Sequence, residues 1–502
     1  MDRDPVNLPS FHSQIRKTVT GLTSHSLGQG NGEAHENTPL LAGNGHGNGH
    51  AVANGHGETY EFFFDSQHTP GTNNPKPWVK YPAHVWHITK ATLLSSPINI
   101  LLVAVPIGII AGKTGWDPVA VFVINFFAII PLAAVLAFAT EEISAKLGEA
   151  LGGLLNATFG NAVELIVSII ALRDRQIEVV KSSMIGSILS NLLLVMGMCF
   201  FFGGIVNMRD EHGHGQEQSF QTITAQTTAS LMTLSAASMI LPGTLFMIIN
   251  DSDDGDKDER NNIVLSLSRG TAIILLLLYV MYLFFQLRTH HKLFSAEAGN
   301  GQDESQLPIA AEAENLRPAV DDEESEAETH MSPWSAGAVL IVTTVLVAIC
   351  ADYLVESIDA LVERAHISRS FIGLILIPIV GNAAEHVTAV VVAVKNKMDL
   401  AMGVAIGSSI QIALFVTPFL VVLGWIMDRE MDLHFETFET VSFALAVLVV
   451  IYTVQDGKSN YLEGAMLMAL YIIIALAFFV TPSQYFNTDW VAGKLSNVVG
   501  ST

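Results

Sequence analysis

The stretch Gly160-Asn161-Ala162-Val163-Glu164 decides the fold of this chain, because it returns as Gly381-Asn382-Ala383-Ala384-Glu385. Each copy places a carboxylate inside a long apolar run. A charged side chain at the centre of a membrane helix costs roughly 3 kcal/mol or more, so an acid in that position indicates a functional site. The return of this combination predicts two related halves.

The two copies stay in step beyond the motif. Residues 160–195 align without a gap to residues 381–416, at a constant offset of 221 positions. The polar positions that carry the repeat are Asn161, Glu164, Gly186, Ser187 and Ser190 in the first half, and Asn382, Glu385, Gly407, Ser408 and Gln411 in the second. Four of these five pairs are identical. A chance match of polar residues at this spacing is improbable, so we interpret it as an internal duplication.

The composition places the chain in a membrane. Half of its 502 residues are hydrophobic, its mean hydropathy is +0.42, and apolar runs long enough to cross a bilayer recur along it. The formal net charge of −23 argues against nucleic acid as a partner. Both cysteines, Cys199 and Cys350, lie in apolar runs, so neither a zinc site nor a disulfide framework is predicted. No resident cofactor is expected.

The predicted fold is an all-α polytopic membrane protein with eleven transmembrane helices. Their predicted ranges are 93–112, 118–139, 148–172, 177–204, 226–249, 262–287, 334–355, 368–394, 398–426, 438–454 and 461–481. Glycine and proline inside these segments, including Gly160, Pro378 and Gly381, predict broken helices.

The predicted organisation is one extra helix followed by two sets of five. It comprises a disordered cytosolic tail at 1–75, a first helix with an aromatic interfacial anchor at 76–115, one five-helix repeat at 116–287, an acidic cytosolic insert at 288–333, a second repeat at 334–481 and a C-terminal tail at 482–502. Five is odd, so the second set enters the membrane from the opposite side. This inverted topology brings both glutamates near the midplane, with Asn and Glu of each motif on one helix face.

Three polar segments outside the helices have alternative interpretations. The acidic stretch 296–330 is a solvated linker by default, or it gathers cations at the pore mouth. The Gly-Asn-His tract at 43–57 is a flexible tail or a weak transition-metal ligand, and the acidic loop at 250–258 imitates an EF-hand but has Asn261 at position twelve. Arg288, His290, His291 and Lys292 after the sixth helix favour a cytosolic insert and N-terminus.

The residue types in the motifs suit a hard cation. Carboxylate, carboxamide and hydroxyl oxygens without cysteine fit calcium best; magnesium demands tighter geometry, and manganese stays open. Glu164 and Glu385 supply charge. The expected neutral ligands are Asn161, Asn382, Ser187, Ser408, Ser190 and Gln411. Structural alternatives remain: the asparagines bond neighbouring helices, the serines cap freed backbone, and His386 is a proton relay or an interface histidine.

The same two carboxylates also make a proton site. Without the cation, burial and mutual repulsion favour their protonated forms, and a bound cation displaces the protons. Mutual exclusion at one site is what an antiporter needs. The alternatives are a gated cation channel, which paired sites in inverted repeats disfavour, and an intramembrane aspartyl protease, which needs two membrane aspartates where this chain has glutamates. The chain is therefore not expected to be an enzyme.

These motifs resemble a known family. Residues 160–164 and 381–386 look like the paired motifs of the cation/proton exchangers within the calcium/cation antiporter superfamily, and residues 395–400 and 407–411 extend the match. From about residue 80 to 481 the chain is similar to fungal vacuolar calcium/proton exchangers. The sodium/calcium branch places Gly-Thr-Ser-type motifs here, and this chain does not.

The resemblance implies an eleven-helix fold whose first helix lies outside the repeats. It also implies a multi-pass protein of the vacuolar membrane that moves calcium into the lumen against returning protons. The family's ion-binding positions carry over to the eight residues named above as ligands.

Overall fold

The fold is described from a computed structural model that covers residues 69, 72, 75–147, 149–209, 213–250, 257–290, 331–365 and 367–480. The chain separates into two compact units, Met1–Gly55 and His56–Thr502, and every described residue belongs to the second. The expected tail disorder, the His tract, the EF-hand-like loop and the acidic insert fall wholly or mostly outside the described residues.

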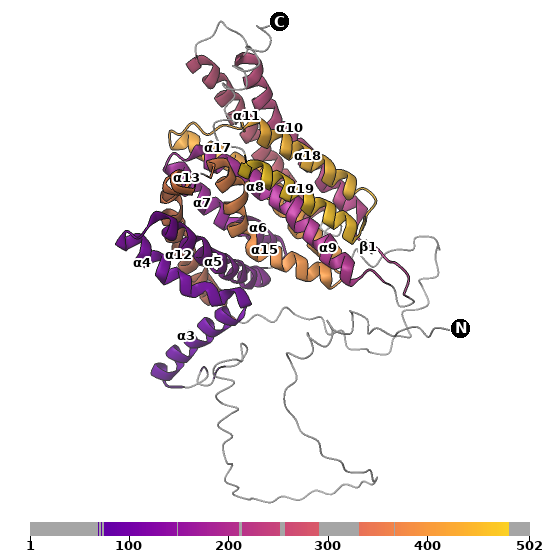
Figure 1. The fold of residues 1–502 in the computed structure, drawn as a ribbon. Helices are drawn as coiled ribbons and strands as arrows, with labels where there is room; N and C mark the ends of the chain where they lie inside the picture. Colours follow the sequence, from indigo (N-terminus) through magenta and orange to yellow (C-terminus); the bar gives the residue numbers. More distant parts are fainter. Residues whose placement is uncertain are drawn as a thin grey trace, which may run out of the picture. The chain divides into compact units, whose positions relative to one another are not determined.

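Helices make up nearly all of the described part of the chain (Figure 1). In chain order the elements are α3 (Pro77–Leu94), η1 (Pro97–Val103), α4 (Ala104–Thr114), α5 (Pro118–Leu147), α6 (Glu149–Phe159), α7 (Ala162–Arg173), α8 (Ile177–Leu189), η2 (Ser190–Val195), α9 (Met196–Val206), β1 (Gln218–Ser219), α10 (Thr222–Asn250), α11 (Lys257–Phe284), η3 (Phe285–Thr289), α12 (Pro333–Glu356), α13 (Ile358–Ala365), α14 (Arg369–Phe371), η6 (Ile372–Leu376), α15 (Ile377–Val394), α16 (Met398–Gln411), η7 (Ile412–Val416), α17 (Thr417–Ile426), α18 (Thr437–Thr453), β2 (Lys458–Ser459) and α19 (Tyr461–Val480). The two short strands pair antiparallel.

Nine helical segments among the described residues are long and apolar enough to cross a membrane. Nine of the eleven predicted helices correspond to them. The other two are 438–454, which is the 17-residue helix α18, and 148–172, which is divided into α6 and α7. The described structure therefore supports a mostly helical membrane protein, while its count of long spans is lower than the predicted eleven.

The region of the first predicted helix differs from the prediction. The sequence predicts one helix over 93–112, but the structure has a 3-10 turn at Pro97–Val103 and a short helix, α4, after it. A residue that precedes proline avoids the helical region, and Ser96 is extended with φ −146° and ψ 141°. The aromatic anchor residues upstream lie on a separate helix, α3, where Trp78 and Tyr81 are exposed.

The two motif segments are interrupted at different places. In the first half the helix breaks at the motif, because α6 ends at Phe159 and α7 begins at Ala162. In the second half α15 runs continuously through Gly381, so the predicted break there is wrong. The irregular turn lies upstream instead, as the π-helical segment η6 just before Pro378. Backbone N–H groups in the first turn of a helix have no partner within the helix, so a proline, which lacks this group, is tolerated there. Helix α15 can therefore begin at Ile377 and continue past Pro378.

A π-helical turn follows the Gly-Ser motif in both halves. In the first half it spans Ser190–Val195, and in the second it spans Ile412–Val416, which begins beside Gln411. A π turn changes the local hydrogen-bond pattern of a helix and often marks a functional site. The duplicated sequence therefore carries a duplicated backbone irregularity next to the predicted ligands.

Two left-handed turns mark the two ends of the described helical unit. Arg175 has φ 62° between α7 and α8, and Asn396 has φ 60° between α15 and α16, at the offset of the sequence repeat. The segment from α8 to α9 is one 30-residue span that leaves the Arg175 turn. Beyond its far end, Asn207 donates a hydrogen bond of 3.2 Å to the Val394 carbonyl, beside the other turn. We call these the Arg175 end and the Asn396 end.

The duplicated helices lie at the centre of the described unit. Helices α5 and α12 pack along each other, and α4 lies beside them (Figure 1). Helices α8 and α15 pack closely, and the turn η2 contacts α16, so the motif-bearing segments of both halves meet in one hydrophobic core. This arrangement leaves Glu385 and Gln411 half-buried and buries the other six predicted ligands, which are Asn161, Glu164, Ser187, Ser190, Asn382 and Ser408.

Candidate cation site

Glu164 occupies the first turn of α7 and is 3% exposed. Neither of its carboxylate oxygens has a hydrogen-bond partner among the described residues. Its neighbour across the site is the glycine of the other motif: a Cβ atom on Gly381 would overlap with Glu164 Oε1. Only glycine lets the acid approach the opposite backbone this closely.

Glu385 on α15 has the reciprocal neighbour. A Cβ atom on Gly160 would lie 3.6 Å from Glu385 Oε1, and Glu385 Oε2 is buried without a partner among the described residues. Each motif therefore presents its glycine to the glutamate of the other motif. The two carboxylates predicted from the duplication come together, one from each half.

A bridge of neutral side chains connects the first motif to α16. Asn161 Nδ2 donates to Gln411 Oε1 over 2.6 Å, and Ser408 Oγ donates to Asn161 Oδ1 over 2.9 Å. The Ser408 hydroxyl also lies within reach of Glu385. Three of the six predicted neutral ligands therefore form one network beside the carboxylates.

The other three predicted neutral ligands, Ser187, Ser190 and Asn382, are also buried. Ser187 is 1% exposed and its hydroxyl has no partner within the described ranges, and the same is true of Asn382 Nδ2. Ser190 Oγ lies 3.3 Å from His386 Nε2. The structure therefore connects Ser190 to the histidine of the second motif, and within the described ranges no hydrogen bond ties Ser187 to the network.

The site contains more acceptor oxygens than the described part of the protein satisfies. Four buried oxygens of predicted ligands lack a partner there: both of Glu164, one of Glu385 and that of Ser187. Leaving a buried polar group unpaired costs about 1–3 kcal/mol, and more when the group is charged. A cation or protons at these atoms would remove this cost, which fits the predicted chemistry.

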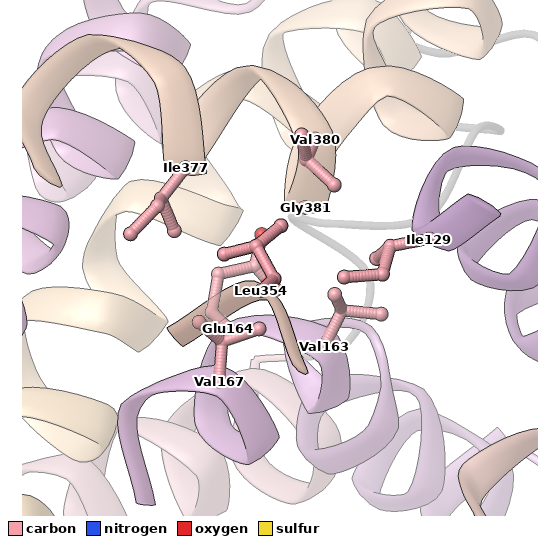
Figure 2. A pocket seen from close by; sticks show the side chains of 8 residues that line it. All are labelled: Ile129, Val163, Glu164, Val167, Leu354, Ile377, Val380 and Gly381. Atoms are coloured by element: carbon pink, nitrogen blue, oxygen red, sulfur yellow. The ribbon is translucent and has the colours of Figure 1, made fainter. Parts of the chain in front are cut away.

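Glu164 forms part of the lining of an apolar pocket. Figure 2 shows its lining, in which Glu164 is the one ionisable residue among Ile129, Val163, Val167, Leu354, Ile377, Val380 and Gly381. Ile129 belongs to α5 and Leu354 to α12, so the paired helices of both halves form part of the wall. Sequence reasoning missed both residues, because a leucine or isoleucine in a membrane helix gives no sign of whether it faces lipid, core or a path.

The acids at helix ends have varied surroundings. The sequence also has four acids at predicted helix ends, for which a solvated helix end is the first interpretation and the lining of an access path the second: Glu141, Glu142, Glu356 and Asp359. Glu142 is 6% exposed and accepts a 3.0 Å hydrogen bond from the Met331 backbone, so solvation is wrong for this residue. Its carboxylate fixes the chain just before α12. Asp359 is exposed and pairs with Arg369 over 2.9 Å, as a solvated helix end does.

Replacing Asn161 by Ala should weaken cation binding more than folding. The change removes both hydrogen bonds of the neutral bridge and one candidate ligand oxygen. We expect the KM for the transported cation to rise about tenfold, which corresponds to ~1.4 kcal/mol. Initial transport rates measured against cation concentration check this. Thr388→Ala on α15, which removes an exposed hydroxyl bonded only within its own helix, is the matched control.

Comparison with known proteins identifies the family of this chain. A family model described as "Sodium/calcium exchanger protein" matches residues 118–288 and 335–480, which is more than half of the chain. The two matched ranges contain the two motifs, and the gap between them is the acidic insert.

Several relatives cover most of the chain. A vacuolar calcium ion transporter of Schizosaccharomyces pombe is 46% identical over 395 residues, which cover 79% of this chain and 87% of the relative. A Ca(2+)/H(+) antiporter of Aphanothece halophytica is 43% identical and covers 76% of this chain and 96% of the relative. The solved structure of native YfkE is 34% identical with a TM-score of 0.60, and covers 76% of this chain and 100% of that one.

The similar proteins include vacuolar calcium ion transporters, a Ca(2+)/H(+) antiporter and vacuolar cation/proton exchangers. The chain belongs to the sodium/calcium exchanger protein family, among its vacuolar calcium transporters and cation/proton exchangers.

Proposed function

We propose that this protein is a secondary active antiporter that exchanges calcium for protons across the vacuolar membrane and loads calcium into the lumen. The relatives named as calcium transporters and as a calcium/proton antiporter support this proposal at the level of transported ions. The observation that carries it is the pair of motif glutamates, each set against the motif glycine of the other half, with buried oxygens that lack partners among the described residues.

The chemistry of exchange follows from this pair. Calcium takes six to eight oxygen ligands, and the two carboxylates neutralise its charge while Asn161, Asn382, Ser187, Ser408, Ser190 and Gln411 supply neutral oxygens. Without calcium, two carboxylates in a dry site are stabilised by taking up protons. The site is thus occupied by calcium or by protons, and either occupant removes the charge that would oppose its movement.

The equivalent helices of the two halves lead to opposite ends of the helical unit, which supports an inverted repeat. Helix α7 leads to the Arg175 turn, and its counterpart α15 leads to the Asn396 turn at the other end of the molecule. In inverted repeats the two halves exchange their conformations, which exposes a central site to one side and then the other. We infer that alternating access of this kind carries the site across the membrane, with Glu164 and Glu385 as the acids that hold the transported ion.

The position of the acidic insert supports an orientation in the membrane. Its flanking residues lie at the Asn396 end, because Met331 is held by Glu142 and Lys146 at the end of α5 opposite to the Arg175 turn. Basic residues after the sixth predicted helix favour the cytosol for this insert. The Asn396 end and the N-terminus are then cytosolic, and the Arg175 end faces the lumen.

Transport by purified protein in proteoliposomes tests the proposal. An imposed proton gradient should drive calcium uptake, and a protonophore should abolish that uptake. Competition with manganese distinguishes a calcium exchanger from a broader divalent cation exchanger. Calcium flux that ignores the proton gradient, or single-channel currents, would replace the antiporter by a channel.

A further inference from the structure

The Arg175 end is closed by direct backbone packing between the two halves. Gly186 of α8 lies against the turn η6 of the second half, where a Cβ atom would overlap with the Leu374 carbonyl. One turn closer to the end, a Cβ atom on Gly373 would lie 2.7 Å from Ser182 Cβ. No space for water or an ion remains between these described segments.

The corresponding place in the other half is open as far as the described residues reach. Gly407 occupies the position of Gly186 in the repeat, and a Cβ atom there would have no neighbour within 4 Å among the described residues. In this one conformation, therefore, Gly186 is tightly packed, whereas its repeat equivalent Gly407 has no close neighbour among the described residues. In the exchange of conformations inferred above, the contact between Gly186 and Leu374 is the one that must separate to open the Arg175 end.

Three acidic side chains hold this closed contact together. Ser370 of α14 is fully buried, and its hydroxyl lies 3.2 Å from Glu178 Oε1 on α8 and 3.4 Å from Glu436 Oε2 at the start of α18. Ser182 of α8 donates to Glu439 Oε1 of α18, and Glu439 is 1% exposed. We call Glu178, Glu436 and Glu439 the acidic latch. The acidic latch joins α8 to α14 and to the start of α18.

The charges around the acidic latch do not neutralise it. Lys181 of α8 pairs with Asp432 and also donates to the His434 carbonyl. Arg369 of α14 is bonded to Asp359, and the His434 ring is stacked on Phe246 of α10. Helix α10 has no charged residue. Glu463 lies in the first turn of α19, at the end of α19 that is away from the acidic latch. Three carboxylates therefore share a site whose lysine already has a carboxylate partner.

The simplest way to keep Glu436 beside the other two carboxylates is to protonate it. Burial raises the pKa of Glu436, which lies outside the helices, to about 8, and the charges of Glu439 and Glu178 act in the same direction. When the contact opens, water and distance remove both causes, and the pKa returns toward its ordinary value near 4.5. The closed arrangement therefore binds protons that the open one releases.

We propose that the acidic latch is a proton-operated gate, which holds the Arg175 end closed while it shares protons and lets it open when it loses them. The sign follows from linkage. Below pH ~4.5 Glu436 is protonated in both arrangements, and the closed arrangement keeps its full stability advantage over the open one. Between pH ~4.5 and ~8, a rising pH progressively removes this stability advantage. Which ion passes through this gate rests on the proposed function, but the pH dependence of its opening does not.

Thiol labelling of the gate tests the proposal without any transport. Ser183 lies on the buried face of α8 at this contact and is 2% exposed, so Ser183→Cys is a conservative reporter. The buried native thiols are removed by Cys199→Ala and Cys350→Ala. The labelling rate of the reporter with a membrane-impermeant reagent is divided by that of an exposed Glu363→Cys reference, which corrects for ionisation of the thiol itself.

In full-length protein in proteoliposomes we expect this ratio to rise about tenfold between pH 5.5 and 7.5. Glu436→Gln with Glu439→Gln keeps hydrogen-bonding groups but cannot ionise, so the ratio should stay low and change less than about twofold. Glu430→Gln, an exposed carboxylate in the same loop, should behave as the parent does.

A parent ratio that is flat with pH overturns the proposal, even if the double variant fails to fold. A double variant that keeps the full pH response overturns it as well. Because labelling reports only the opening, a protein that transports nothing but opens with pH contradicts the antiporter and retains the gate.

Discussion

Glu164→Gln should lower calcium transport by about 100-fold or more, and Glu385→Gln should do the same. A divalent ion in this site depends on two carboxylates for neutrality, and each substitution leaves one positive charge uncompensated in a buried position. Breaking a buried charge arrangement by removing one partner costs about 3 kcal/mol or more, which corresponds to two decades in rate or affinity. Proton-driven calcium uptake into proteoliposomes measures the loss.

The control for this pair is Glu363→Gln, because Glu363 is exposed at a helix end and has no place in the site. Its transport should match that of the parent. Glutamine is nearly isosteric with glutamate, so both motif variants should still purify as folded protein. Survival of transport in Glu164→Gln and in Glu385→Gln would remove these residues from the mechanism.

Gly186→Ala should destabilise the protein far more than the equivalent change in the other half. The added methyl group would overlap with the carbonyl oxygen and with two further backbone atoms of Leu374, and backbone cannot rotate away as a side chain can. Overpacking of this kind typically costs about 1–3 kcal/mol, and we expect the upper part of that range or loss of folding. Thermal unfolding in detergent should show Tm lowered by several degrees.

The duplication supplies the matched control for this substitution. Gly407→Ala makes the same chemical change at the equivalent position, where the methyl group has open space among the described residues. Its Tm should stay close to that of the parent, although the methyl group would obstruct a conformation in which this half closes. Equal destabilisation by the two substitutions would show that the asymmetry of the two glycines is not real.

The candidate site could be predicted from the sequence because its signal is unusual. Acids in apolar helices are costly, and their return at a constant offset is enough to identify Glu164 and Glu385 as partners. The spacing of three residues also places Asn161 on the helix face of Glu164, where the neutral bridge to α16 lies.

The same sequence could not specify how the halves meet. The motif glycines are identical, yet the helix breaks at Gly160 and continues through Gly381. Likewise Gly186 is packed while Gly407 is open, because packing depends on which conformation the two halves adopt. An inverted repeat has at least two such conformations, so a pattern shared by both halves cannot tell which half is closed.

The acidic latch was missed for a different reason. Glu178, Glu436 and Glu439 lie near predicted helix ends, where acids are normally solvated, and they are far apart in the sequence. Glu439 is buried and the other two are half-buried, and hydrogen bonds with Ser370 and Ser182 bring the three acids together between α8 and the second half. Long-range packing of this type has no periodicity or spacing that a single sequence displays.

Proton release on calcium binding tests the central claim most directly. Calorimetric titration of calcium into the purified transporter at pH 7, in buffers of different ionisation enthalpy, counts the protons released for each ion bound. If Glu164 and Glu385 hold either calcium or protons, binding should release protons, and the double Gln variant should neither bind calcium tightly nor release them. Tight calcium binding with a heat that is independent of the buffer would contradict the account.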